Sequence, residues 1–184
     1  SNVWYANGYV WANKSFDSGG AFFITNGSSV SFLNLAMDTN ESAEVGGGEN
    51  TIGGAFGLVF DSELSLDHCT IYGNNSISGG VSGLYSSNSI VDIRSSIFWN
   101  NPGQWDGESG QLIGAGFDVS YSDIQGGYEG PGNIDIDPLF CNFSYFELAE
   151  NSPLLGLGQN GTDIGAAGAG CDPIYNSDIQ FVDI

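Results

Sequence analysis

The fold is decided by one stretch, Leu64-Ser65-Leu66-Asp67-His68-Cys69-Thr70-Ile71-Tyr72-Gly73-Asn74, whose spacing of apolar residues recurs along the chain. Its frame is Leu64-x-Leu66-x-x-Cys69-x-Ile71-x-x-Asn74. Four more copies of this frame occupy residues 3–13, 30–40, 91–101 and 117–127. Five copies of one frame indicate a protein built from stacked repeats.

The repeat length is 27, 34, 27 and 26 residues between successive copies, measured at Tyr5, Phe32, Leu66, Ile93 and Val119. The one long interval contains a polar, Gly-rich run at residues 44–50, which we interpret as a loop inserted into one coil. Short alternating apolar segments without helical periodicity are typical of a solenoid with short strands. The sequence therefore predicts an all-β fold, a right-handed parallel β-helix of about five rungs.

Side chains alternate along a strand, so the frame predicts which positions face the interior. Two inward columns are expected: Val10, Met37, Ile71, Phe98 and Ile124, and Gly8, Leu35, Cys69, Ser96 and Ser122. Asn13, Asn40, Asn74 and Asn101 should stack at a corner, where Asn can hold left-handed turns and pass hydrogen bonds between coils.

A Gly-Gly block precedes three copies of the frame, at residues 19–24, 53–58 and 79–84. No such block precedes Val3, so the first coil is expected to expose strand edges and an apolar cross-section. We expect this end to be covered by further coils or by end-to-end contact in a homo-oligomer or filament. The strand-like tail at residues 177–184 is the candidate for that contact.

Composition excludes several classes of protein. The 184 residues include 22 Asp and Glu against two cations, Lys14 and Arg94, which gives a formal net charge of −20. Such a chain cannot neutralise nucleic-acid phosphates and is repelled by anionic membrane surfaces. No apolar run reaches the roughly 18 residues of a membrane span. Hydrophobic residues make up 41% of the chain, which also excludes a disordered acidic tail.

Two of the three cysteines are candidates for a disulfide. Cys69 belongs to an inward column and is expected to stay a buried thiol. Cys141 and Cys171 enclose a loop of about thirty residues that an oxidising compartment would close, the alternative being two free thiols.

The repeats resemble the right-handed parallel β-helix proteins of the pectin-lyase-like superfold, especially secreted bacterial β-helix repeat proteins. The likeness rests on the Asn-x-Ser segments at residues 13–16 and 74–77, each followed by Gly-Gly, and on closing strings at residues 133–140, 151–153 and 161–166. Residues 152–158 depart from it, because related chains usually have Ser-Pro-Ala-Ile-Asp-Ala-Gly there. The resemblance implies secretion, with repeats at residues 1–127 and a small Gly-rich C-terminal cap at residues 128–184.

Few side chains of this chain could act as a catalytic base. Polysaccharide lyases of this fold generally need a base and cations that neutralise uronate, which leaves Lys14, His68 and Arg94. We expect Arg94 to pair with Asp67 of the neighbouring coil, and no template position gives His68 a carboxylate or Ser partner. No convergent base site is therefore predicted.

Paired carboxylates offer an alternative to a catalytic base, as a glycosidase site or a Ca²⁺ site. Asp92 and Asp118 share an outward column on adjacent coils, a spacing that would suit the two carboxylates of a glycosidase or a Ca²⁺ bridge. Asp135 and Asp137 alternate with Ile residues and are further Ca²⁺ candidates, although no Ca²⁺-binding motif occurs.

Outward aromatic residues give the better binding argument. Trp11, Tyr72 and Trp99 fall in one column that Asp38 interrupts, and aromatic platforms stack on sugar rings. Packing beneath a loop, such as residues 102–110 with Trp105, is the alternative. The sequence thus predicts a non-catalytic extracellular β-solenoid, a structural or adhesive surface module without a cofactor, whose partner would be a surface polysaccharide. A carbohydrate-active enzyme using Asp92 and Asp118 is the alternative function.

Overall fold

The computed structural model describes residues 2–16, 18–43, 53–76, 80–102 and 111–175. The inserted loop at residues 44–50, the Trp105 loop and the tail at residues 177–184 lie outside these described residues.

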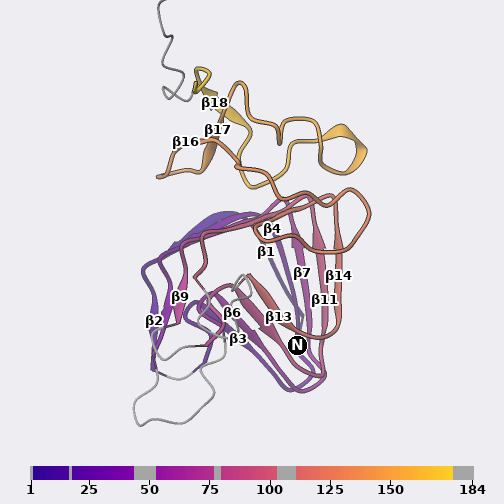
Figure 1. Ribbon diagram of the computed structural model, residues 1–184. Coiled ribbons are helices and arrows are strands. Elements are labelled where there is room, and N and C mark those ends of the chain that lie inside the picture. Colours follow the sequence, from indigo (N-terminus) through magenta and orange to yellow (C-terminus); the bar gives the residue numbers. More distant parts are fainter. Residues whose placement is uncertain (1, 17, 44–52, 77–79, 103–110, 176–184) are drawn as a thin grey trace, which may run out of the picture.

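Parallel strands dominate the described part of the chain, whose one helical element is the short 3-10 turn η1 (Gln159–Gly161). Three parallel sheets curl around one interior, as Figure 1 shows, an arrangement compatible with a β-solenoid. The eight-stranded sheet contains β1 (Asn2–Trp11), β4 (Ser29–Asp38), β7 (Glu63–Asp67), β8 (Thr70–Tyr72), β11 (Ile90–Arg94), β12 (Ile97–Trp99), β14 (Phe117–Ser120) and β15 (Asp123–Ile124). The four-stranded sheet contains β3 (Phe22–Ile24), β6 (Phe56–Leu58), β10 (Leu84–Ser86) and β13 (Leu112–Gly114). The three-stranded sheet contains β2 (Lys14–Ser15), β5 (Glu41–Ser42) and β9 (Asn75–Ser76).

The register of the eight-stranded sheet confirms the five-copy frame. Its aligned residues are Tyr5, Phe32, Leu66, Ile93 and Val119 in one row, and Val10, Met37, Ile71, Phe98 and Ile124 in another. Because equal spacing within each copy places equivalent residues side by side, the sequence repeat becomes the hydrogen-bonding register.

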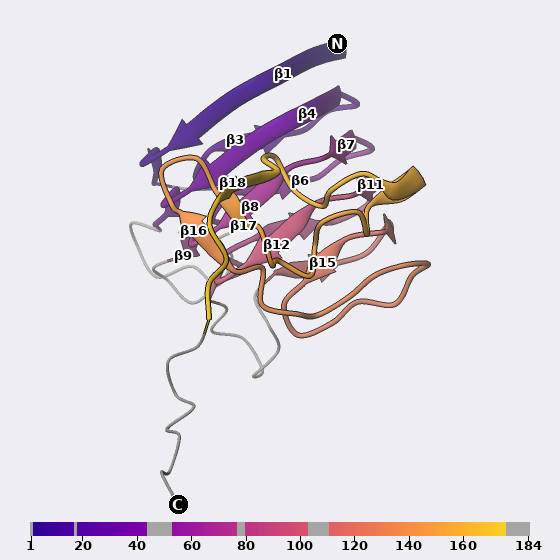
Figure 2. The same cartoon turned by 90° about the horizontal axis from the view of Figure 1, so that it is seen from above.

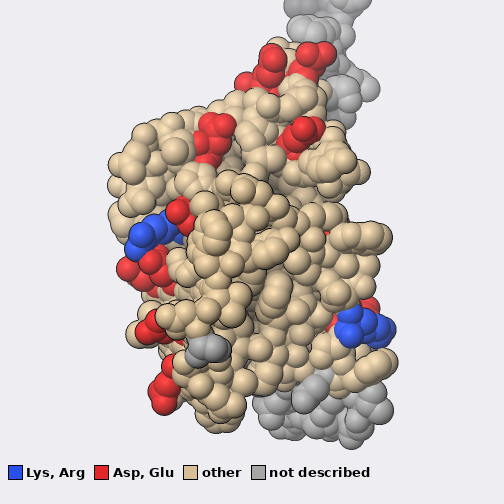
Figure 3. All heavy atoms as spheres, turned by 180° about the vertical axis from the view of Figure 1, so that it is seen from behind, with Lys and Arg blue, Asp and Glu red and all other residues tan. Residues whose placement is uncertain are grey.

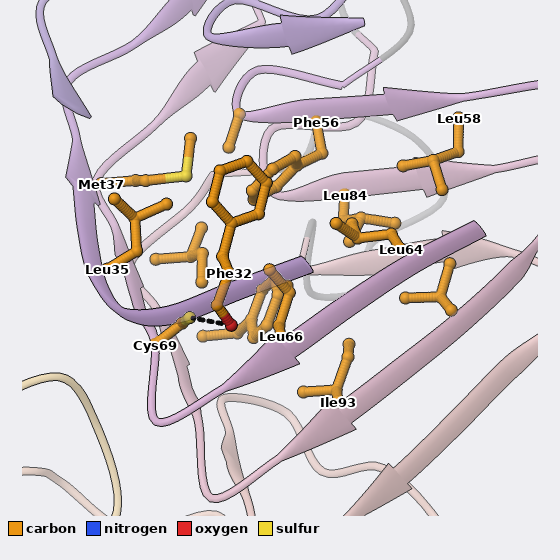
Figure 4. Packing of buried hydrophobic residues seen from close by; sticks show 14 of the residues in the cluster. Phe32, Leu35, Met37, Phe56, Leu58, Leu64, Leu66, Cys69, Leu84 and Ile93 are labelled. Carbon is orange, nitrogen blue, oxygen red and sulfur yellow. Dashed lines mark hydrogen bonds between the residues drawn. The ribbon is translucent and has the colours of Figure 1, made fainter. Parts of the chain in front are cut away.

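The two predicted inward columns are buried in the four later copies of the frame, whereas Gly8 and Val10 of the first copy are only partly buried. Leu35, Met37, Cys69, Ile71 and Phe98 are fully buried, and they pack with apolar residues of the four-stranded sheet, among them Phe56 and Leu84. Figure 4 shows Leu35, Met37, Cys69, Phe56 and Leu84 pointing into the space between the sheets, with the Cys69 thiol donating to the carbonyl of Phe32. Burial raises the pKa of Cys69 to about 12, so the thiol stays protonated and unreactive.

The Asn corner is confirmed as a hydrogen-bonded ladder, but these Asn residues do not hold the left-handed turns. The residue before each of them has positive φ instead: Ala12, Thr39, Gly73 and Asn100. The turn at the preceding residue lets the Asn side chain point inward, where Asn40, Asn74 and Asn101 are buried and bond from coil to coil.

The third Gly-Gly block is not equivalent to the first two. Phe22 aligns with Phe56 as the motif predicts, but Leu84, rather than Ser82, aligns with Phe56 in the next coil. Close backbone contact decides this register. A Cβ at Gly54 would lie 2.4 Å from the carbonyl oxygen of Ser82, and one at Gly83 would lie 2.1 Å from that of Gln111. Gly83 therefore makes the close approach in that coil.

The region after the last coil has two parts. Ile134 bridges Asp123 in parallel and extends the stack past β15. The chain then runs back across the outer face of the eight-stranded sheet, as Figure 2 shows, and forms a small mixed sheet of β16 (Phe140–Asn142), β17 (Glu147–Ala149) and β18 (Ala169–Cys171). We call residues 137–175 the C-terminal layer. Whether residues 127 and 128 mark a domain boundary stays a prediction.

Candidate functional site

The C-terminal layer is joined to the eight-stranded parallel sheet by apolar packing and by hydrogen bonds to two successive repeats. Ile164, Phe146 and Leu148 of the layer pack with Ile97 and Ala36 of the outer face. The amide of Gly165 donates to the Ser95 carbonyl (2.8 Å), and the amide of Ala166 donates to Oγ1 of Thr70 (3.0 Å). Gly165 has φ +104°, and a Cβ there would lie 2.5 Å from Cδ1 of Ile97. Glycine therefore allows the layer to lie this close to the sheet.

An aromatic cavity of about 480 Å³ lies where the layer meets the outward column. Tyr72 and Trp99 come from the adjacent strands β8 and β12, whose register places them directly side by side. The cavity is lined by Tyr72, Trp99, Asp137, Leu139, Phe140, Phe143 and Ile174. The predicted pair of aromatic residues is thus brought together, and the layer adds two further rings that no repeat pattern identifies.

Ring contacts and one hydrogen bond hold Tyr72 in place. Its centroid lies 5.7 Å from that of Phe140 in an edge-to-face arrangement and 5.5 Å from that of Phe143. The Asn100 amide donates to the Tyr72 hydroxyl at 3.2 Å. Phe143 remains 55% exposed, so part of this aromatic wall faces solvent. The sequence also raised the alternative that Tyr72 packs beneath a loop. Tyr72 is indeed packed against other rings, and these rings, Phe140 and Phe143, belong to the C-terminal layer.

Trp11 lies in the same column but away from the cavity. It pairs in register with Asp38, which pairs in turn with Tyr72. Its side chain is 62% exposed, and it is not among the residues that line the cavity. Sugar binding by Trp11 stays a prediction.

Asp92 and Asp118 are register neighbours on β11 and β14, as expected. The predicted ion pair between Arg94 and Asp67 is wrong, because Arg94 bonds to Asp92 two residues earlier on its own strand. Positions i and i+2 share one face of a strand, which brings these two side chains together. Burial raises the pKa of Asp92, the Arg94 charge lowers it, and the Asp118 charge raises it. Catalysis by Asp92 and Asp118 stays a prediction.

His68 has the partners that the template did not supply. Its Nδ1 lies 2.8 Å from Oδ1 of Asp67, and its Nε2 lies 3.0 Å from Oγ1 of Thr162. The Thr162 hydroxyl is also 2.9 Å from the carbonyl of Gln159. Repeat analysis misses this carboxylate–imidazole–hydroxyl chain because Thr162 belongs to the layer. This chain of contacts links the C-terminal layer to the turn that follows β7.

Asp123 is a buried acid that sequence reasoning also misses. Its side chain is fully buried, Oδ1 accepts the amide of Ile136 at 3.1 Å, and Oδ2 has no hydrogen-bond partner among the described residues. Burial, followed by the charges of Asp135 and Asp137, raises the pKa of Asp123 to about 7, against the effect of the Ile136 hydrogen bond. The repeat places Asp123 in register after Ala36, Thr70 and Ile97, but alternation along the strand makes this column face outward, so the repeat does not indicate its burial.

The four Ca²⁺ candidates form two separate pairs. Asp92 and Asp118 lie on the repeat strands, whereas Asp135 and Asp137 lie in the segment after the last coil. Across residues 2–16, 18–43, 53–76, 80–102 and 111–175, no group of three or more His, Cys, Asp or Glu side chains could hold a metal ion. A Ca²⁺ site at these aspartates would therefore need ligands of other types.

The predicted disulfide is confirmed, and it lies within the C-terminal layer. Cys141 on β16 is bonded to Cys171 on β18, and Cys69 is free and buried. A disulfide is compatible with an oxidising, extracellular compartment. In the described segments, no helix is long and apolar enough to cross a membrane.

No protein-family model, curated protein or solved structure matches the chain.

Proposed function

We propose that this chain is a non-catalytic extracellular surface module, a right-handed parallel β-helix of the pectin-lyase-like type that binds a polysaccharide. The parallel five-copy register and the disulfide support the fold and the secretion. The aromatic cavity at Tyr72 and Trp99 carries the function, because sugar rings stack on aromatic faces and cavities of several hundred Å³ hold small ligands. End-to-end association through the exposed edge of β1 remains part of this proposal.

Affinity electrophoresis and calorimetry with a panel of oligosaccharides test this function. We expect Trp99→Ala and Phe143→Ala to weaken binding at least tenfold, because each removes a ring from the cavity wall. Trp4→Ala is the matched control, since Trp4 is 69% exposed on β1 and does not line the cavity. Thermal unfolding of each variant separates lost binding from lost folding, and exposed Phe143 is the safer substitution.

The enzymatic alternative makes a different prediction for the same material. Release of reducing ends by the purified chain would contradict a non-catalytic module. Loss of that release in Asp92→Asn and Asp118→Asn would assign the reaction to the carboxylate pair. The raised pKa of Asp92 is the observation that favours this alternative, since a glycosidase needs one protonated carboxyl group.

A further inference from the structure

One wall of the aromatic cavity carries a negative charge. Asp137 supplies it, as the one carboxylate among the described lining residues. Oδ1 of Asp137 accepts the amide N–H of Leu139 at 2.9 Å, which restrains the carboxylate that lines the cavity. Such a carboxylate can accept hydrogen bonds from sugar hydroxyls, and it binds a charged donor more strongly.

A further charge of the same sign lies close by. Asp135 stands two residues before Asp137, and both carboxylates act on the buried Asp123, whose pKa of about 7 leaves it partly protonated. The two cations of the chain are engaged elsewhere, Lys14 with Glu41 and Arg94 with Asp92. Figure 3 shows that, on the face in view, both lie against acidic side chains. The potential at the cavity is therefore negative, and it attracts cations.

Aromatic faces add to this preference. The faces of Trp, Tyr and Phe rings carry negative electrostatic potential, so an ammonium group placed over them is attracted, most strongly when it is partly desolvated. Tyr72, Trp99, Phe140 and Phe143 supply such rings beside Asp137. A uronate polymer would meet repulsion from Asp137, and a neutral polymer would meet this carboxylate only through hydroxyl groups, which are weaker donors than an ammonium group.

We propose that the cavity takes an amino sugar with a free, protonated amine. The sugar ring stacks on the aromatic wall, and its ammonium group pairs with the Asp137 carboxylate. This inference rests on the proposed function and names the sugar class that it leaves open.

Calorimetry on the full 184-residue chain compares tetrasaccharides of three sugars: unacetylated glucosamine, N-acetylglucosamine and galacturonate. We expect the unacetylated tetramer to bind most tightly. Asp137→Asn should weaken that binding about tenfold, since a hydrogen bond to a charged group is lost. The same substitution should leave binding of the acetylated tetramer unchanged within about twofold. The Asn side chain can still accept the Leu139 amide, so the local turn is preserved.

Glu63→Gln is the matched control for total charge. Glu63 is exposed on β7 and does not line the cavity, so this variant should bind as the native chain does. Equal weakening by Glu63→Gln and Asp137→Asn would overturn the inference, because the attraction would then be non-specific. Equal affinity for both glucosamine tetramers, dependent on Phe143, would overturn it while leaving the proposed function intact. Binding of none of the three would overturn the inference, and binding of no member of the wider oligosaccharide panel would contradict the proposed function itself.

Discussion

At the scale of single residues, burial decides what one acid does to stability. Asp123 continues an outward column through Tyr9, Ala36, Thr70 and Ile97. Tyr9 is exposed, but the other members are buried, and Ala36 and Ile97 pack against the C-terminal layer. The pKa of Asp123 in the folded chain is raised to about 7 from 3.8, so the folded state binds a proton that the unfolded state has released. The contribution of Asp123 to stability is therefore fully present below about pH 4 and is lost as the pH rises through 7.

Asp123→Asn should remove this pH dependence. One pKa unit corresponds to about 1.4 kcal/mol, so the penalty is on the order of 4 kcal/mol at pH 8 and near zero at pH 4. We expect the variant to be more stable than the native chain at pH 8 and similar to it at pH 4, measured by urea unfolding across this range. Glu129→Gln, an exposed acid in the same region, controls for the loss of one charge. A variant that is less stable than the native chain at pH 8 would contradict the assignment.

At the scale of elements, the Asn ladder fixes the spacing of the coils. Asn74 accepts bonds from the Asn40 backbone N–H (3.1 Å) and Nδ2 (2.9 Å), and its own Nδ2 donates to Oδ1 of Asn101 (3.0 Å). These groups are buried, so each one left without a partner costs about 1 to 3 kcal/mol. One Asn side chain thus forms hydrogen bonds with both neighbouring repeats.

Asn74→Ala should lower the free energy of unfolding by about 2 to 4 kcal/mol, because it strands partners on both neighbouring coils. Asn13→Ala is the matched control at the exposed end of the ladder, where the expected cost is under about 1 kcal/mol. Chemical denaturation monitored by Trp fluorescence measures both. Equal costs would show that burial of the ladder does not set its contribution.

At the scale of the whole molecule, the C-terminal layer and the eight-stranded parallel sheet stabilise each other through a second core. That core joins Ile97 and Ala36 of the sheet to Phe146, Leu148 and Ile164 of the layer. The disulfide crosses the layer and closes a loop between positions 30 residues apart. It restrains the unfolded layer rather than the repeats.

Replacing both Cys141 and Cys171 by Ser should destabilise the layer by about 3 to 4 kcal/mol, the loop-entropy value for this length. We expect hydrogen exchange to speed up in β16, β17 and β18 while β7 and β11 keep their protection, because the main core does not include the layer. In the native chain, non-reducing mass spectrometry should find one bridge and one protected thiol. Uniform loss of protection across all strands would show that layer and coils unfold as one unit.

The sequence by itself determined the strand register, the inward columns and the Asn ladder, because each depends on spacing that repeats from coil to coil. It also placed Tyr72 beside Trp99, since both occupy one frame position. The third Gly-Gly motif, which includes Gly80, has the sequence of the first two but not their register. The register there follows the close backbone contact at Gly83.

Only the tertiary structure decided what covers the outward column. Residues 137–175 contain no repeat, and their contacts with the coils, such as Thr162 with His68 and Ala166 with Thr70, span more than ninety residues of sequence. Such contacts form on a surface that exists only after the coils have stacked. The aromatic cavity, the partners of His68 and the burial of Asp123 depend on that surface, so no local spacing in the chain could specify them.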